Sequence, residues 1–437
     1  MPTLFHDAGL KDVRHVKLCG GTHTYCGHPR QCGIYNFGGG EIAVVHHHAP
    51  CRYEQHGDVR HDYAGYHGRA VRLLQRSLDG GETWPPEHHV VIYDESAPIA
   101  ERRDRVFGGG DEPRARLDMS GDGAIFNWVR SWVGPEDEQG VPRMITFAMR
   151  SIDKGRTWER TPTLVYHPFN RDMGLLADNH PVVRMPDGTF LSALSVSRAG
   201  VCLFGTDDDG LTWNYVSTIV RAGEDLVGGS PTYAGLILLP TGRLLCFMLF
   251  KKGRIPCICM SGSDDGYHWT EPRAIVRWGA SPWRRVPVEK KRCVGAPQCR
   301  LNTLAFGDGV SFGKEDLPGA DWTCEGPDCP RGDICGPRDQ VYYRSPWPMV
   351  LADGRLVVLF ARRRIPYGIG CLFSEDQGAS WSREHVIRAD GFSPDMGYPV
   401  ATQLDDGRIF AAYYISLEDG NRFGGSRFIG GSFFNLP

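Results

Sequence analysis

Short apolar runs of strand length alternate with polar turns along most of the chain. Residues 347–360 show the unit, W-P-M-V-L-A-D-G-R-L-V-V-L-F, in which an Asp-Gly turn joins two apolar runs. This pattern predicts a β-hairpin. Its turns are Gly39-Gly40, Asp122-Gly123, Asp187-Gly188, Thr241-Gly242, Asp353-Gly354 and Asp406-Gly407. The 55 Gly and 30 Pro interrupt any long helical pattern, so we predict an all-β protein.

A second kind of turn carries a fixed set of residues. Counting back from a Trp, it has Ser or Thr at minus seven, Asp at minus five and Gly at minus three. The copies are Ser77/Asp79/Gly81/Trp84, Ser151/Asp153/Gly155/Trp158, Thr206/Asp208/Gly210/Trp213, Ser374/Asp376/Gly378/Trp381 and a weaker Asp264/Gly266/Trp269, in which Gly262 replaces the hydroxyl. The Asp carboxylate can accept hydrogen bonds from backbone N–H groups of the turn, and Gly supplies a positive φ. We expect the Trp to fill the gap between neighbouring hairpins.

Each inner hairpin and the following Asp-containing hairpin together form a four-stranded unit of about 55 residues, the size of a propeller blade. Six units begin near residues 33, 114, 180, 231, 346 and 397. We therefore predict a single domain, 1–437, that is a six-bladed β-propeller of four-stranded antiparallel blades. The last unit lacks a strand, and residues 12–18 are expected to supply it and close the ring. Residues 284–341 are a Cys-rich insertion or a degenerate seventh blade, and their poor strand alternation favours the insertion.

The Trp-containing turn is the Asp-box, or BNR repeat. From about residue 30 onward the chain resembles the sialidase-like β-propeller superfamily, which includes exo-α-sialidase-like bacterial proteins. The resemblance is specific for the fold and weak for the chemistry, because the Asp-box is a structural turn.

Charge and the chain ends bear on partners and compartment. The net charge of −3 gives no basic surface for nucleic acid or an anionic membrane, so we expect an oligosaccharide or glycoconjugate as partner. The oligomeric state stays open. The N-terminus lacks a basic segment followed by an apolar one, and no N-x-S/T sequon occurs, which predicts a cytoplasmic protein. A mature secreted chain would have the same features, so that alternative stays open.

Candidate chemistry gathers on one face of the predicted disc. Because strands alternate in direction, the inner turns and the Asp-boxes lie on one face, and the loops joining second to third strands lie on the other. That second face collects Arg, His, Tyr and Asp, which can bind a carboxylate, stack on a sugar and move a proton. We predict an acidic-sugar site there. The substrate-binding candidates are Arg344, Arg364, Arg130, His180, Asp178, Arg198, His48 and Tyr367.

The resemblance to sialidases implies hydrolysis of a terminal sialic or uronic acid by an exo-acting glycosidase. Sialidases use three Arg on the substrate carboxylate, a Tyr nucleophile activated by a Glu, and an Asp as acid/base. Here Arg344, Arg364 and one of Arg130 or Arg254 would form the Arg triad. Tyr398 or Tyr343 would be the nucleophile, and Asp395 is the further catalytic candidate. The chain departs from the pattern, because its Arg-Ile-Pro tripeptides stand at 254–256 and 364–366 rather than near the start of the propeller. No Glu is evidently paired with a Tyr.

Two alternatives remain. A propeller polysaccharide lyase would neutralise a uronate carboxylate with Arg and use a His pair, His47 and His67, for proton transfer. A non-catalytic propeller that binds glycans or proteins is the third reading. Hydrolysis is placed first because the segments around residues 364–369 and 395–399 resemble those of sialidase-like chains.

Cysteine and histidine cluster near the N-terminus. Cys19, Cys26 and Cys32, with His23 and His28 among them, are spaced for a zinc site, although no C-x-x-C is present. We expect no cofactor for catalysis and a structural zinc or calcium ion. The five Cys of residues 284–341 could staple a segment without a core of its own.

Overall fold

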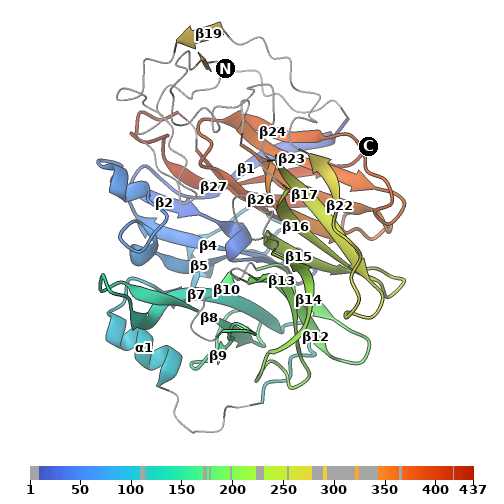
Figure 1. Cartoon of the computed structure of the whole chain (residues 1–437). Helices are drawn as coiled ribbons and strands as arrows, with labels where there is room; N and C mark the ends of the chain where they lie inside the picture. The colour runs from blue at the N-terminus through green and yellow to red at the C-terminus, as the bar shows by residue number, and fades with distance from the viewer. Residues whose placement is uncertain are drawn as a thin grey trace.

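The computed structural model describes residues 9–108, 114, 116–170, 175–176, 179–196, 199–222, 231–252, 255–277, 289–292, 320–323, 343–363, 367–416 and 418–437. These residues form a six-bladed β-propeller of antiparallel sheets, as predicted. In Figure 1 the sheets follow one another around the ring, from blue through green to red, and blue β1 lies beside red β27. No helix among the described residues is long and apolar enough to cross a membrane.

The sheets take their strands in chain order. Blade one contains β2 (Thr24–Gly27), β3 (Ile34–Asn36), β4 (Ile42–Pro50), β5 (Val71–Ser77) and β6 (Val90–Asp94). Blade two contains β7 (Ile125–Glu136), β8 (Pro142–Ser151) and β9 (Thr163–Leu164). Blade three contains β10 (Leu175–Leu176), β11 (Val183–Arg184), β12 (Phe190–Val196), β13 (Gly200–Thr206) and β14 (Asn214–Arg221).

The second half of the ring is more regular. Blade four contains β15 (Thr232–Leu238), β16 (Leu244–Lys252), β17 (Ile255–Ser263) and β18 (Arg273–Arg277). Blade five contains β21 (Tyr343–Val350), β22 (Leu356–Arg362), β23 (Tyr367–Ser374) and β24 (His385–Gly391). Blade six contains β25 (Gly397–Gln403), β26 (Ile409–Ser416), β27 (Arg427–Asn435) and β1 (Lys11–Cys19). Because β1 pairs with β27, the two ends of the chain share one sheet.

Elements outside the blades are short. The helices are α1 (Ile99–Phe107) and the 3-10 turns η1 (Pro29–Gln31), η2 (His56–Val59), η3 (His67–Arg69) and η4 (Pro86–His88). The helix α1 covers an edge of blade two, where Arg103 donates to the carbonyls of Val133 and Gly134. Most of residues 284–341 lies outside the described residues. In the described part of this insertion, β19 (Glu289–Arg292) pairs in parallel with β20 (Ala320–Thr323), unlike the antiparallel strands of a blade.

The Asp-box turns are closed by their own side chains. In the first, the Ser77 hydroxyl donates to Asp79 at 2.7 Å and accepts from the Gly81 N–H at 2.8 Å. The other oxygen of Asp79 accepts from the Thr83 hydroxyl at 2.6 Å, and Trp84 Nε1 donates to the Gly81 carbonyl at 2.9 Å. The second, third and fourth boxes repeat the bond from the hydroxyl to the Asp and the bond from the Gly N–H to the hydroxyl.

The weaker fifth copy differs from the sequence prediction. Ser263, not Gly262, supplies the hydroxyl that accepts from the Gly266 N–H at 2.9 Å. Asp265, not Asp264, accepts from the backbone of His268 at 2.8 Å, while Asp264 forms an ion pair with Arg243. The turn is one residue shorter than the others, so the working hydroxyl and carboxylate stand at minus six and minus four from Trp269.

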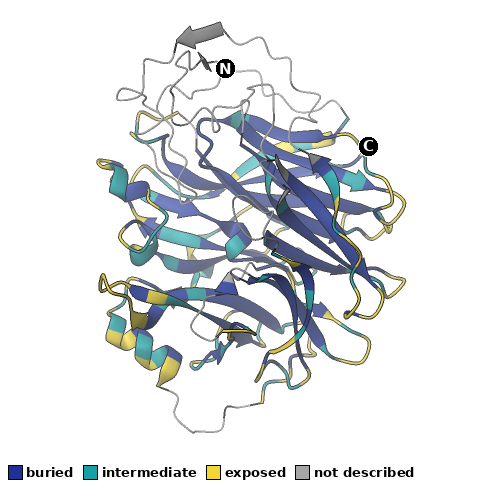
Figure 2. Cartoon of the chain, in the orientation of Figure 1, coloured by how far each residue is buried: buried dark blue, intermediate teal, exposed yellow. Residues whose placement is uncertain are grey.

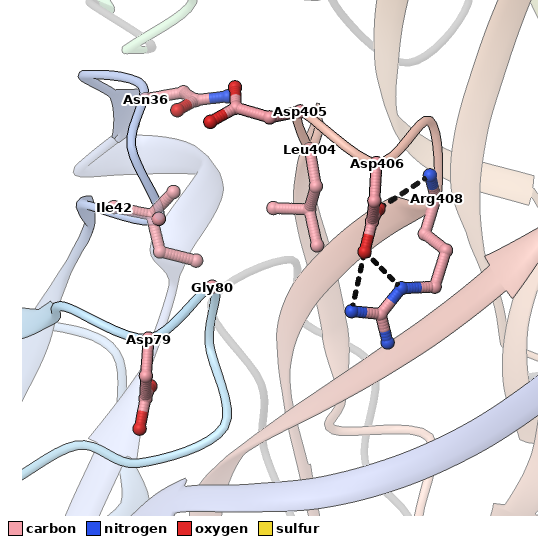
Figure 3. A pocket seen from close by; sticks show the side chains of 9 residues that line it. Asn36, Ile42, Asp79, Gly80, Leu404, Asp405, Asp406 and Arg408 are labelled. Carbon is pink, nitrogen blue, oxygen red and sulfur yellow. Dashed lines mark hydrogen bonds and ion pairs between the residues drawn. The ribbon is translucent and has the colours of Figure 1, made fainter.

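The turns of neighbouring blades meet on the Asp-box face. A pocket of about 210 Å³ lies between the turns of blades one and six, lined by Asn36, Gly40, Ile42, Asp79, Gly80, Leu404, Asp405, Asp406 and Arg408. Figure 3 shows side chains that line it. The Gly39 N–H donates to Asp405 across this gap at 2.7 Å. The Asp-box and the inner turn of blade one also join directly, through Gly80 N–H to the Gly40 carbonyl at 2.8 Å. These contacts place both kinds of turn on one face.

The core lies between adjacent sheets. Figure 2 shows the strands largely buried and the turns exposed. Box tryptophans take part in this core: the ring of Trp213, 7 % exposed, lies 4.9 Å from that of Trp128 and 5.4 Å from that of Phe126. Aromatic pairs at such distances add to the burial energy.

Two innermost strands are interrupted, and the interruptions cross the centre of the ring. In blade one η1 separates β2 from β3, and in blade three the described residues Asn179 and His180 stand between β10 and β11. Arg30 of η1 is fully buried and donates to the Ala234 carbonyl at 2.6 Å and the Pro346 carbonyl at 3.1 Å. Asn179 donates to the carbonyls of Gln31 and Trp128. Arg30, Asn179 and His180 form what we call the axial plug, which ties blades one, three, four and five together.

Candidate functional site

Histidine, tyrosine and one aspartate converge at the ends of the strands opposite the Asp-box turns. They come from β2 and the residue before η1, from β4 and the loop joining it to β5, and from the ends of β15, β21, β25, β26 and β27 on that side of the ring. We call this set the rim cluster: Tyr25, His28, His47, His61, Tyr66, His67, Tyr233, Arg344, Asp395, Tyr398, Tyr414 and Arg427.

Asp395 is the buried charge of the rim cluster. It is 0 % exposed, and its oxygens accept from Tyr414 at 2.6 Å, Tyr25 at 3.0 Å and Arg427 Nε at 2.9 Å, with His61 Nε2 at 3.3 Å. Burial alone would raise the pKa of Asp395, but the charges of His61 and Arg427 outweigh it and hold that pKa well below its usual value. Asp395 is therefore a permanent carboxylate that orders the phenols around it.

A relay of three side chains lies beside this carboxylate. The Tyr66 hydroxyl forms hydrogen bonds with Nδ1 of His28 and, at 3.1 Å, with Nε2 of His67. Burial, and then the neighbouring histidines, lower the pKa of His28 and of His67 well below their usual values. Both imidazoles are thus neutral near pH 7, so each can accept a proton.

The run His46–His48 is divided by the pleat of β4. Successive side chains point to opposite faces of a strand, so His47 faces the rim cluster and His46 and His48 face away from it. The rings of His47 and His67 lie 4.8 Å apart at 83°. Burial lowers the pKa of His47 as well. His48, expected to bind substrate, stands instead beside His46, with ring centroids 6.2 Å apart.

The His47–His67 side of the rim cluster is partly open to solvent. His47, His67, Arg130 and Trp132 are each of intermediate exposure. The ring of Trp132 lies 5.5 Å from that of His67, and the charge of Arg130 contributes to lowering the pKa of both His47 and His67. A cation, an aromatic face and two neutral imidazoles therefore share one accessible edge.

Tyr398 stands at the start of β25, within the same cluster. Its hydroxyl lies 2.7 Å from that of Tyr233, which accepts from Arg344 Nη2 at 2.9 Å. The Arg363 guanidinium lies 5.4 Å from the centre of the Tyr398 ring. Burial raises the pKa of Tyr398, and the partner identified for its hydroxyl among the described residues is a phenol rather than a carboxylate.

The innermost strands of blades four, five and six share an unusual backbone conformation near the rim cluster. Tyr233, Ser345 and Tyr398 have φ of 59°, 56° and 51°, in the left-handed region that bulky residues rarely adopt. Each falls at a register shift between the innermost strand and its neighbour. Bulges of this kind re-aim side chains, and three successive blades carry one at the same place.

Other sequence candidates lie elsewhere. His180 belongs to the axial plug, where its Nε2 donates to the Pro348 carbonyl at 2.9 Å, so it is no longer a substrate-binding candidate. Tyr343 faces the core on the opposite side of β21 from Arg344 and donates to Glu384 at 3.1 Å. Tyr367 is 3 % exposed within the core. The candidates Asp178, Arg198, Arg254 and Arg364 lie outside the described residues.

Two groups of side chains have the spacing of metal ligands. His28, His47 and His67 bring ligand atoms within 4.8 Å of one another, and so do Cys19, Cys26 and His46. Cys32, expected in the second group, is separate from it, because its sulfur lies 3.9 Å from the ring nitrogens of His47.

Sequence reasoning missed Tyr25, Tyr66 and Arg427, and it assigned His28 to the cysteine group. Tyr25 and Tyr66 stack with ring centroids 3.9 Å apart, although 41 positions separate them in the sequence. Tyr25 lies on the four-residue strand β2 and Tyr66 directly before η3, and both stretches are too short for a hydrophobic period to mark a direction. The one available signal was the density of His and Tyr between residues 23 and 67.

Comparisons with known proteins bear on the fold. No protein-family model and no curated protein sequence matches the chain. A solved structure from Dyadobacter fermentans, of unknown function, superposes with a TM-score of 0.63 at 19 % identity, covering 98 % of this chain and 100 % of the other.

Sialidase structures superpose less closely. The Trypanosoma rangeli sialidase, in complex with 2,3-difluorosialic acid as a covalent intermediate, gives a TM-score of 0.50 at 11 % identity, with 97 % of this chain and 58 % of the other covered. The NanB sialidase from Streptococcus pneumoniae gives 0.50 at 12 % identity, with 96 % and 70 % covered. The chain has a propeller fold similar to that of sialidases.

Proposed function

We propose that the rim cluster is the active site of a carbohydrate-active enzyme and that it cleaves an oligosaccharide by β-elimination at a uronate. The observation that carries the proposal is the geometry around His67, whose Nε2 lies 3.1 Å from the Tyr66 hydroxyl and whose ring lies beside those of His47 and Trp132. Burial, with the charges of His61 and Arg130, lowers the pKa of His67. Such an edge suits a planar carboxylate on a sugar ring, because Arg binds carboxylates with a planar fork and aromatic rings stack on sugar faces.

Each residue then has a role in the elimination. Arg130 pairs with the uronate carboxylate, which makes the proton on C5 more acidic. The Tyr66 phenol donates to Nδ1 of His28 and accepts from Nε2–H of His67, which leaves the lone pair on Nδ1 of His67. That nitrogen takes the C5 proton, the electron pair forms the C4–C5 double bond, and the C4–O bond breaks. The imidazolium of His67 returns the proton to the departing oxygen, so no other reactant is consumed.

Hydrolysis fits the same residues less well. A sialidase-type acid must carry a proton, whereas the pKa of Asp395 is held well below its usual value by His61 and Arg427. A sialidase-type Tyr nucleophile is paired with a Glu. In the described part of the chain, Tyr398 contacts the Tyr233 phenol, and Glu384 lies instead against Arg362 and Tyr343.

Hydrolysis remains the second candidate because of the Tyr398–Tyr233–Arg344 array. A guanidinium that donates to one phenol of a bonded pair favours the ionised form of that pair. Arg344 and Arg363 would then bind the carboxylate of a terminal sialic or uronic acid, and Tyr398 would be the nucleophile.

The test is incubation with uronate-containing oligosaccharides and, separately, with sialosides. Elimination gives an unsaturated uronate, seen as new ultraviolet absorbance and as fragments whose summed mass equals that of the substrate. Hydrolysis adds one water to the products and no absorbance. Release of free sialic acid by the wild type, and its loss in Tyr398→Phe, would show that the enzyme hydrolyses its substrate and would contradict elimination. Binding of either glycan without any product would indicate a non-catalytic propeller.

A further inference from the structure

The remaining group of Cys and His lies at the seam of the ring. Cys19 ends β1, which belongs to the sheet of blade six, and Cys26 and His46 lie on β2 and β4 of blade one. Cys26 and His46 are both 0 % exposed, and Cys19 is of intermediate exposure. The three side chains therefore join the N-terminal strand to the first blade on the far face of β4 from the rim cluster.

Their spacing is that of ligands around a tetrahedral zinc ion. With Zn–S near about 2.3 Å and Zn–N near about 2.0 Å, a tetrahedral angle of about 109° separates two sulfurs by about 3.8 Å and a sulfur from a nitrogen by about 3.5 Å. The Sγ atoms of Cys19 and Cys26 lie 3.7 Å apart, and Cys19 Sγ lies 3.4 Å from Nε2 of His46.

The tautomer of His46 is set for ligation. Its Nδ1 lies 2.9 Å from the His47 carbonyl, which can only accept, so Nδ1 carries the proton. In the neutral ring the lone pair is then on Nε2, the atom that faces Cys19. A metal-binding histidine usually donates a hydrogen bond from the nitrogen that does not bind the metal, because that bond fixes the ring and raises the basicity of the other nitrogen.

We propose that Cys19, Cys26 and His46 bind a structural zinc ion that locks the closure of the propeller. Two thiolates and an imidazole are the ligand types that zinc prefers in such sites. His48 lies on the same face of β4 as His46, outside this group of three. The ion would link β1, the closing strand of blade six, to β2 and β4 of blade one.

Cobalt substitution tests this site separately from the trio His28, His47 and His67. Full-length protein is purified under reducing conditions, stripped of metal and titrated with Co²⁺, and the thiolate-to-cobalt charge-transfer absorption is recorded. A site made of histidines alone gives no such absorption. We expect one equivalent of the band in wild type, its loss in Cys19→Ser and in Cys26→Ser, and competition by Zn²⁺.

The matched control is Cys202→Ser, since Cys202 is an equally buried thiol on β13 of blade three. It should keep the full band. Absence of the band in folded wild-type protein would overturn the proposal, even if the cysteine variants failed to fold, and so would its persistence in Cys19→Ser. Protection of Cys19 and Cys26 from alkylation that is reversed by a reductant but not by a chelator would also overturn it, because it would identify a disulfide.

Discussion

The two faces of the propeller are built in opposite ways. On the Asp-box face a turn closes on itself, as Ser77 bonds Asp79 two positions away. On the other face, Tyr25 reaches Asp395 across 370 positions, and Tyr233 reaches Tyr398 across 165. The first face is local structure repeated around the ring, and the second is assembled from different blades and exists only when the ring is closed.

This difference has a consequence for stability and chemistry. The Ser or Thr and the Asp of a regular Asp-box bond within their own turn, whereas the rim cluster buries a carboxylate, five phenols and neutral imidazoles together. Such concentrations of perturbed titratable groups are typical of functional sites, because shifting a pKa costs folding energy. Substitutions on the two faces should therefore separate activity from stability.

The largest effect is expected from the rim. His67→Gln keeps a hydrogen-bonding side chain but removes the base, so turnover of the acidic oligosaccharide should fall by about 10²–10⁴-fold with the melting temperature little changed. His268→Gln is the control, because His268 is an exposed histidine of an Asp-box turn. Equal turnover of His67→Gln and wild type would remove His67 from the mechanism.

On the Asp-box face the order should be reversed. Trp213→Ala removes a buried indole that packs on Trp128 and Phe126, and it should lower the free energy of unfolding by about 3–5 kcal/mol. The value of kcat/KM measured well below the melting temperature should stay that of wild type. Tyr267→Ala, at a box position 65 % exposed, should change stability by less than about 0.5 kcal/mol. Denaturant titrations of the two variants give both numbers.

The same difference explains what the sequence could predict. The repeat of Asp, Gly and Trp is local, so it led to the blades, and strand direction then indicated which face collects His47, His67, Asp395 and Tyr398. Alternation along β4 was available too, and applying it would have separated His47 from His46 and His48. The axial plug was out of reach, because η1 meets blades three to five through long-range bonds of Arg30 and Gln31, which no local pattern marks.

The axial plug should show an effect of intermediate size, which can be measured as a change in how the free energy of unfolding depends on pH. Burial, with the charge of Arg30, lowers the pKa of His180 to about 3 from 6.5. Below about pH 6.5 His180 becomes protonated in the unfolded chain but stays neutral in the folded protein. The contribution of neutral His180 to the free energy of unfolding is therefore complete above that pH and decreases as the pH falls. The slope is about 1.4 kcal/mol per pH unit for one such group.

His180→Gln should therefore flatten the fall in unfolding free energy by about 2 kcal/mol between roughly pH 6.5 and 5, relative to wild type. The comparison is between the two curves, because His28, His47 and His67 contribute in the same direction to both. Urea titrations at several pH values measure it, and parallel curves would mean that the pKa of His180 is not lowered in the folded protein.

The smallest effect tests the shortened Asp-box turn. Ser263→Ala deprives the buried Gly266 N–H of its acceptor and should cost about 1–3 kcal/mol, because an unpaired buried donor carries its full desolvation penalty. Asp264→Ala removes the carboxylate at the position that the other boxes use. It should nevertheless change stability by less than about 0.5 kcal/mol, because the Asp264 side chain is 76 % exposed and pairs with Arg243 at the surface. A larger loss of stability in Asp264→Ala than in Ser263→Ala would contradict this assignment. It would show that the fifth turn uses the same positions as the other four.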